Sequence, residues 1–341
     1  MDTISVLKTL TAAAGVSGDE QEIADVAAEL LKPFGEVTRD RIGNVVCRVA
    51  GTGRRVLLDA HMDQIGLAVL EITPEGFLRC APCGGADKRV LTGAEVTVCG
   101  KEKLFGVVTS TPPHLQKDGD KETLPETIII DIGLSKEQAE THVSPGDRVL
   151  LRPQFRILQN NCVSAPALDD RAGLCVLLEA LEILQQNGCS DDITVVFSTR
   201  EETTEGGAKS AAYNAKADLC IAVDVSFAHT PDAKPQDCGV LGKGVMIGFA
   251  PSLTHTVSKG LTAVAKAKNI PYQTEVMGGR SGTNADVISM EAGGCATGLL
   301  SVPQRYMHTG IEVVSVEDVE NTAKLLAAYL LEGAQYAENL M

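Results

Sequence analysis

Strands and helices alternate along residues 160–331, and this alternation constrains the fold more strongly than any other feature of the sequence. Amphipathic helices are expected over 172–184, 261–268, 285–292 and 316–331, and apolar strands over 193–198, 219–223 and 297–302. Such alternation is typical of an α/β fold in which helices cover both faces of a mixed, largely parallel sheet. We therefore predict this architecture for the larger part of the chain.

Two helices are expected before the first strands. Ser17 and Glu20 have the spacing of a capping box, with Ser17 as the N-cap, and this predicts a second helix that ends near Leu31. Apolar or β-branched runs follow at 44–49 and 55–59, and the glycine-containing turn between them predicts a β-hairpin. Because the second run is apolar without interruption, we expect it inside the sheet.

The stretch from 67 to 156 has a different pattern, in which glycine, proline and aspartate interrupt short alternating segments. This pattern predicts a small β-rich domain. With 341 residues, the chain is also longer than a single hydrophobic core usually supports. We therefore predict a discontinuous larger domain, residues 1–66 and 157–341, with residues 67–156 inserted into it.

The composition argues against two classes of partner. A formal net charge of −15 disfavours binding to nucleic acid, and no segment has the apolar length of a bilayer-spanning helix. The N-terminus lacks the basic and apolar regions of a secretory signal, so a cytoplasmic location is expected. The ten cysteines are interpreted as reduced thiols, including Cys80 and Cys83, since a structural zinc site would need a second such pair.

Side chains that bind metals follow several of the predicted strands, where open α/β sheets usually bind their ligands. They are His61 and Asp63, Asp169 and Asp170, Glu201 and Glu202, Asp224, and His308. Each alone is more often a turn, cap or hydrogen-bonded residue. Together they would concentrate negative charge that bound cations stabilise, and histidine with carboxylate ligands suits zinc, cobalt or manganese.

The adjacent pair Glu201-Glu202 follows the apolar run 193–197 directly. Two neighbouring side chains at the end of a strand point in different directions, so one can bind a metal while the other transfers a proton. A hydrolase that activates water with a metal needs both functions.

Five motifs occur in one order along the chain: His61-Met62-Asp63-Gln64-Ile65-Gly66, Ala167-Leu168-Asp169-Asp170-Arg171-Ala172-Gly173, Glu201-Glu202, Val223-Asp224 and Arg305-Tyr306-Met307-His308. Together they resemble the tetrahedral aminopeptidase family, di-metal exopeptidases also described as glutamyl or deblocking aminopeptidases, some of them labelled cellulase M or endoglucanase. The resemblance implies a zinc exopeptidase-like fold with an inserted β-rich domain. It also implies a homo-oligomer built from dimers, which can be a dodecamer, with the insert as the expected contact surface.

The resemblance implies that Asp169 bridges two divalent ions, with His61 and Asp224 on one ion and Glu202 and His308 on the other. Zinc is the expected metal, with cobalt or manganese as alternatives.

By the same resemblance, Glu201 would be the general base, and Asp63 would orient the imidazole of His61. A carboxylate that receives the second N–H of a ligand histidine is a common arrangement.

The predicted function is that of a metal-dependent aminopeptidase, which removes N-terminal residues from peptides by means of water activated at two metal ions. Two alternatives stay open: another amide metallohydrolase, such as an N-acyl amino acid deacylase, or an inactive assembly or binding protein. Three places depart from the usual family pattern: Arg200 stands where glutamine is common, Thr203-Thr204-Glu205 stands where valine, glycine and a basic residue are usual, and Asn284 replaces a frequent aspartate. None of them removes a proposed ligand.

Overall fold

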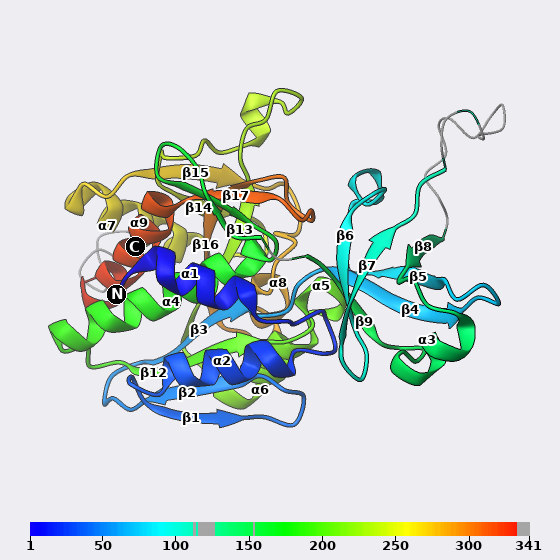
Figure 1. The fold of residues 1–341 in the computed structure, drawn as a ribbon. Coiled ribbons are helices and arrows are strands. Elements are labelled where there is room, and N and C mark those ends of the chain that lie inside the picture. The colour runs from blue at the N-terminus through cyan, green and yellow to red at the C-terminus, as the bar shows by residue number, and fades with distance from the viewer. Residues whose placement is uncertain (112–113, 115–126, 153, 333–341) are drawn as a thin grey trace.

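The computed structural model describes residues 1–111, 114, 127–152 and 154–332. Figure 1 shows a large body of sheet and helices with a smaller group of strands beside it. Two chain crossings join the parts, one entering β4 and one leaving β9.

Within the described residues, eleven strands form the central sheet of the large body. The order of the main path is β1-β2-β12-β3-β13-β16-β17-β11-β10, and β14 joins β16 with β15 on its other side. The bounds are β1 Glu36–Arg39, β2 Val45–Val49, β3 Arg55–His61, β10 Arg156–Ile157, β11 Cys162–Ala165, β12 Asp192–Ser198, β13 Leu219–Phe227, β14 Val245–Phe249, β15 Tyr272–Val276, β16 Ala296–Arg305 and β17 Glu312–Ser315.

The centre of this sheet is parallel. Strands β12, β3, β13 and β16 are paired in parallel, so their carboxyl ends meet at one edge. The flanking pairs β1–β2, β2–β12, β16–β17 and β11–β17 are antiparallel. The predicted mixed, largely parallel sheet is therefore confirmed.

The predicted hairpin between 44–49 and 55–59 is wrong. Strand β12 lies between β2 and β3 and pairs with both of them. The glycine-containing segment crosses over the start of β12 instead, where the N–H groups of Thr52 and Gly53 donate to the carbonyl of Ser190. The apolar continuity of β3 is explained, because it is an interior strand of the sheet.

Helices cover both faces of the sheet. Neighbouring residues of a strand point to opposite faces, so Val56 and Leu58 belong to the large core under α1, α2, α4, α7 and α9, whereas Leu57 packs with α6 and α8. The helix bounds are α1 Thr3–Ala12, α2 Gln21–Leu31, α3 Lys136–His142, α4 Leu168–Asn187, α5 Glu201–Thr204, α6 Gly206–Ala215, α7 His255–Lys268, α8 Ala285–Ile288 and α9 Val316–Glu332, with short 3₁₀ turns at Lys88–Val90, Pro235–Asp237 and Glu291–Gly293.

The predicted capping box at Ser17 is also wrong, although α2 does end at Leu31. Glu20 is the N-cap, and its carboxylate accepts the N–H of Gly18 rather than a helical N–H. The Ser17 hydroxyl instead lies 2.9 Å from that of Thr203 in α5, the short helix after β12. A tertiary contact has replaced the local cap.

The inserted strands close into a barrel in the order β4-β5-β8-β7-β6-β9. Their bounds are β4 Gly66–Ile72, β5 Leu78–Cys83, β6 Glu95–Cys99, β7 Lys103–Val108, β8 Ile128–Asp131 and β9 Arg148–Leu151. The barrel has its own apolar core, which includes Leu67, Val96, Ile130 and Val149. The predicted small β-rich insert is thus present.

None of the helices in the described ranges is long and apolar enough to cross a membrane. All ten cysteines are free thiols.

Candidate metal centre and active site

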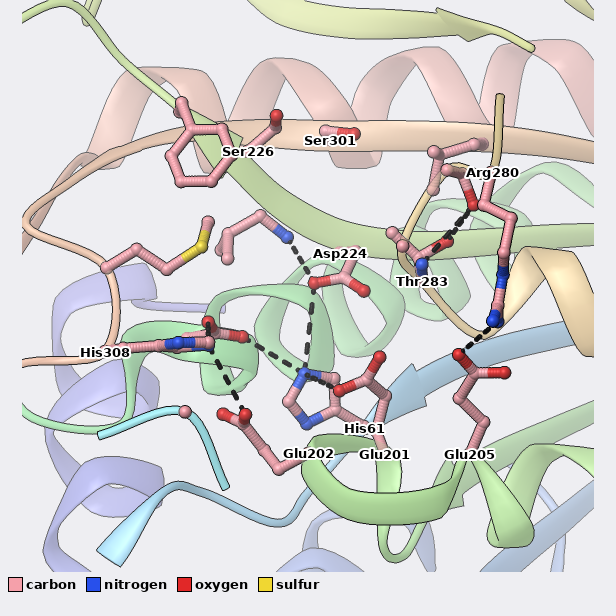
Figure 2. Close-up of a pocket in the computed structure, with 18 of the residues that line it drawn as sticks. His61, Glu201, Glu202, Glu205, Asp224, Ser226, Arg280, Thr283, Ser301 and His308 are labelled. Carbon is pink, nitrogen blue, oxygen red and sulfur yellow. Dashed lines mark hydrogen bonds and ion pairs between the residues drawn. The ribbon is translucent and has the colours of Figure 1, made fainter. Parts of the chain in front are cut away.

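The seven predicted site residues come from elements that meet at the carboxyl edge of the parallel strands. They are His61 at the end of β3, Asp63 just beyond it, Asp169 in the first turn of α4, Glu201 and Glu202 in α5 after β12, Asp224 in β13, and His308 after β16. Figure 2 shows His61, Glu202, Asp224 and His308 pointing toward a common centre. The parallel pairing brings these distant segments together.

Asp169 lies between the two histidines. Its Oδ1 is 3.1 Å from Nε2 of His61, and its Oδ2 is 3.5 Å from Nε2 of His308. Glu202 completes the second side, with Oε2 at 3.3 Å from Nε2 of His308. The carboxylate of Asp169 therefore has one oxygen beside each of the two histidines.

Two further carboxylates approach the other histidine. Oε2 of Glu201 lies 3.8 Å and Oδ1 of Asp224 lies 3.9 Å from Nε2 of His61. Both distances are too long for hydrogen bonds.

Two sets of described residues, which we call the first and second donor groups, could each hold a metal ion, because the ligand atoms within a set lie within 4.8 Å of one another. The first donor group is His61, Asp170 and Asp224, and the second is Asp169, Glu202 and His308. Asp170 was among the candidate side chains at the strand ends, but it was not assigned to either ion. It is fully buried, and its Oδ2 has no hydrogen-bond partner among the described residues. The same is true of Oε1 of Glu202.

Burial shapes the protonation of the cluster. It raises the pKa of Glu201 to about 7, against the opposing effect of His61, and it raises the pKa values of Asp170, Glu202 and Asp224 well above their ordinary range. Burial alone would lower the pKa of His61, but Glu201 and the other neighbouring carboxylates raise it well above 6.5. Buried carboxylates with unused acceptor atoms beside two histidines fit divalent cations.

Asp63 connects the strand of His61 with the loop that carries the glutamates. Its carboxylate accepts the backbone N–H of Glu201 over 2.9 Å and that of Glu202 over 3.3 Å. Nδ1 of His61 lies 3.0 Å from the backbone carbonyl of Asp63 and 3.6 Å from its Oδ1. The backbone of Asp63 thus orients the imidazole more closely than its side chain does.

Glu312, at the start of β17, was not identified from the sequence. This fully buried carboxylate accepts the backbone N–H of Asp169 with Oε2 and that of His308 with Oε1, both over 3.1 Å. It therefore holds the backbone of two residues of the second donor group in place. Its only sequence signal was a glutamate opening an apolar run four residues after His308.

The backbone turns sharply beside several site residues. Ala167, Arg200 and His308 have left-handed conformations, with φ of 61°, 59° and 63°. Non-glycine residues rarely adopt this region, and they do so most often near functional sites. These turns direct the chain from a strand into the cluster.

The barrel also reaches the site. A turn after β5 places Gly84 and Gly85 against the second donor group, and a Cβ on Gly85 would lie 2.5 Å from Nδ1 of His308. The N–H of Asp87 donates to the carbonyl of His308 over 3.1 Å. The inserted segment therefore forms one wall around His308.

A cavity of about 640 Å³ opens over the cluster. Its other walls come from the loop 203–205, from β13 and β16, and from the segment 280–283. Arg280 bridges two of these walls: its guanidinium lies 2.6 Å from Glu205 and 3.2 Å from Asp286. The cavity is large enough for an amino acid side chain together with adjoining peptide.

Comparison with known proteins places this geometry among peptidases. The family model described as M42 glutamyl aminopeptidase matches residues 43–325. A lysyl aminopeptidase of Pyrococcus furiosus is 35% identical over 335 residues, which cover 96% of each chain.

Solved structures agree. A TET aminopeptidase from a marine sediment Thaumarchaeota archaeon has a TM-score of 0.93 at 29% identity, with 99% of each chain covered. The TET1 peptidase of Pyrococcus horikoshii, which can assemble into a tetrahedron or a large octahedral shell, has a TM-score of 0.86 at 34% identity. That match covers 97% of this chain and 100% of the archaeal one.

Proposed function

The chain belongs to the M42 glutamyl aminopeptidase family, and we propose that it removes N-terminal residues from peptides at the cluster around Asp169. The family membership confirms the resemblance drawn from the five motifs. The observation that carries the proposal is the placement of Asp169, with one oxygen toward each of two histidines.

Two divalent ions would be held by His61, Asp224, Glu202 and His308, with Asp169 between them and Asp170 on the side of His61. When bound, such ions lower the pKa of water and polarise the scissile carbonyl group. Zinc is our preferred metal, with cobalt or manganese as alternatives, because all three accept histidine and carboxylate ligands.

Glu201 would act as the general base. It lines the cavity, lies beside the cluster and is held by the hydrogen bond from its own N–H to Asp63. Its carboxylate would accept a proton from water and later deliver that proton to the leaving amine. Asp63 would position Glu201 and Glu202 through their backbone.

The acidic cavity supports a preference for free N-termini. Glu201, Glu202 and Asp224 line it, and a free α-amino group can bind a metal ion held there or meet a nearby carboxylate, whereas an acylated nitrogen can do neither. This favours an aminopeptidase over the alternative deacylase.

A comparison of Leu-Ala-Ala with its N-acetyl form tests this function. The enzyme is first stripped of metal with a chelator, then reloaded with zinc, cobalt or manganese, and products are followed by mass spectrometry. We expect leucine release from the free peptide alone, and only after reloading. Cleavage restricted to the acetylated peptide would support a deacylase, and no cleavage with any metal would support an inactive scaffold.

We also propose that the chain forms a homo-oligomer built from dimers. The Pyrococcus horikoshii relative assembles into closed shells, and the barrel is our candidate for a contact surface. Size-exclusion chromatography with light scattering tests this assembly, which a monomer at working concentrations would contradict.

A further inference from the structure

The wall of the cavity beyond the metal cluster contains a buried carboxylate that the proposed chemistry does not use. Glu275, in β15, lines the cavity together with Ser226 and Ser301. The Ser226 hydroxyl donates to Oε1 of Glu275, and the Ser301 hydroxyl donates to Oε2 over 3.1 Å. Both carboxylate oxygens are therefore held in place by side chains of the sheet.

This carboxylate lies close to the reacting centre. Ser301 pairs in register with Asp224 across the parallel strands β16 and β13, and Ser226 is two residues beyond Asp224 on the same face of β13. Figure 2 shows Ser226 and Ser301 on the side of Asp224 away from Glu201 and Glu202. A side chain that leaves a substrate bound at the cluster can extend toward this wall.

No counter-ion accompanies Glu275 in the part of the chain that the structure describes: none of the ion pairs there includes it. Among the described residues that line the cavity, Arg280 is the only lysine or arginine, and Glu205 and Asp286 already pair with it. Burial raises the pKa of Glu275, against the hydrogen bonds from Ser226 and Ser301, which lower it. A buried carboxylate without a cation is costly, and a cationic ligand relieves that cost.

Apolar side chains complete the approach to this carboxylate. Met277, Leu299 and Val225 line the same cavity. A lysine or arginine stem packs well on such a surface while its charged end meets an acid. An acidic substrate side chain would instead meet Glu275 as a like charge.

We propose that Glu275 determines specificity in this cavity and selects N-terminal residues with a cationic side chain, lysine or arginine. This inference rests on the proposed aminopeptidase function and adds a substrate class to it. The serines position the carboxylate, and Glu275 pairs with the incoming ammonium or guanidinium group.

The test uses zinc-loaded enzyme and the p-nitroanilides of lysine, arginine, leucine and glutamate. We expect kcat/KM for the lysyl and arginyl substrates to exceed that for leucyl, with glutamyl the poorest. In Glu275→Gln the lysyl-to-leucyl ratio should fall about 10- to 100-fold, the range for a hydrogen bond to a charged group. Glu36→Gln, which removes an exposed carboxylate from β1, is the matched control and should keep the wild-type ratio.

A binding measurement separates this inference from the proposed function and does not depend on how the Glu275 variant folds. Zinc-loaded Glu201→Gln is titrated calorimetrically with Lys-Ala-Ala, Leu-Ala-Ala and Glu-Ala-Ala. Tightest binding of the lysyl peptide supports Glu275 even if no substrate is cleaved. Hydrolysis of leucyl or glutamyl substrates in preference to lysyl, or equal binding of the three peptides, overturns the inference and leaves the aminopeptidase standing.

Discussion

The backbone N–H of Glu201 donates to the carboxylate of Asp63 over 2.9 Å, which joins the end of β3 to the first turn after β12. This contact fixes the base relative to His61, two residues before Asp63 in the chain. The position of the base therefore depends on the pairing of two neighbouring parallel strands.

Replacing Glu201 by glutamine should separate proton transfer from metal binding. We expect kcat to fall about 10²- to 10⁴-fold, the usual contribution of a general base, because an amide cannot accept the proton of water. Metal content, measured by mass spectrometry of the purified protein, should match the wild type. The control is Glu205→Gln, which alters the same segment but not the base. Turnover at the wild-type rate in Glu201→Gln would exclude the assigned role of Glu201.

Glu312→Gln should weaken metal binding rather than chemistry. The amide nitrogen of glutamine would face one of the two backbone N–H groups, of Asp169 or His308, that Glu312 now accepts. We expect the affinity for the more weakly held ion to fall about 10- to 100-fold, as for other residues that support ligands. Zinc titration with a competing chelator measures this change, and Glu317→Gln, an exposed glutamate of α9, is the control. Unchanged zinc affinity would show that Glu312 serves only the fold.

The stabilisation by metal should grow as the pH rises. Without metal, the folded pKa of Glu201 is about 7 against an ordinary 4.5, so the folded chain binds more protons than the unfolded chain between these values. Raising the pH through this window therefore lowers the free energy of unfolding. The raised pKa of His61 acts in the same direction, since stability from its protonated form is lost as the pH rises through that value.

Metal-bound protein escapes this loss because the cations replace the protons. The difference in Tm between zinc-loaded and metal-free protein should widen by about 5 °C or more from pH 5 to pH 8. Differential scanning calorimetry of both forms measures it. In Glu201→Gln the widening should be smaller, and a difference that shrinks with pH would contradict the assigned protonation.

Asn284→Asp should destabilise the protein. Nδ2 of Asn284 donates to Oδ2 of Asp59 over 2.7 Å and to Ser198 over 2.9 Å, and both members of the first pair are buried. An aspartate would set two buried carboxylates against each other, at a cost of about 2–4 kcal/mol at pH 8 and less at pH 5, where they can share a proton. Urea unfolding measures the loss. The double variant Asp59→Asn with Asn284→Asp exchanges donor and acceptor and should recover most of it.

Gly85→Ala should disturb His308 from the side of the barrel. The added Cβ would lie 2.5 Å from the imidazole, so the ring has to move away from Asp169 and Glu202. At the same low free zinc concentration, we expect fewer zinc ions per chain than in the wild type, with the fold intact by circular dichroism. Gly278→Ala adds a methyl group where no atom lies within 4 Å and should bind metal normally. Full zinc content in Gly85→Ala would show that the turn containing Gly85 can move away from His308 and leave the imidazole in place.

The sequence predicted the α/β class, the β-rich insert and the family, because apolar periodicity and the motifs at strand ends can be recognised within short stretches of sequence. Its failures concern contacts between distant segments. The pattern around Gly51-Thr52-Gly53 is typical of a hairpin, and nothing local reveals that β12 enters between β2 and β3.

At the site, too, residues in local motifs could be predicted and contacts between distant segments could not. The motifs brought His61, Asp169 and Glu201 to attention, but the support from Glu312 depends on β17 lying behind both Asp169 and His308. The left-handed turns at Ala167 and Arg200 also leave no sequence signal, because neither residue is a glycine.

The two histidines differ in their access to water: the side chain of His61 is 2% exposed and that of His308 is 33% exposed. An ion beside His61 would exchange slowly, whereas one beside His308 would follow the metals available in the surroundings. One chain would then hold a permanent ion and a replaceable one. When zinc is scarce, the replaceable position would be the first to lose its ion or to accept another metal, while the fold stayed the same.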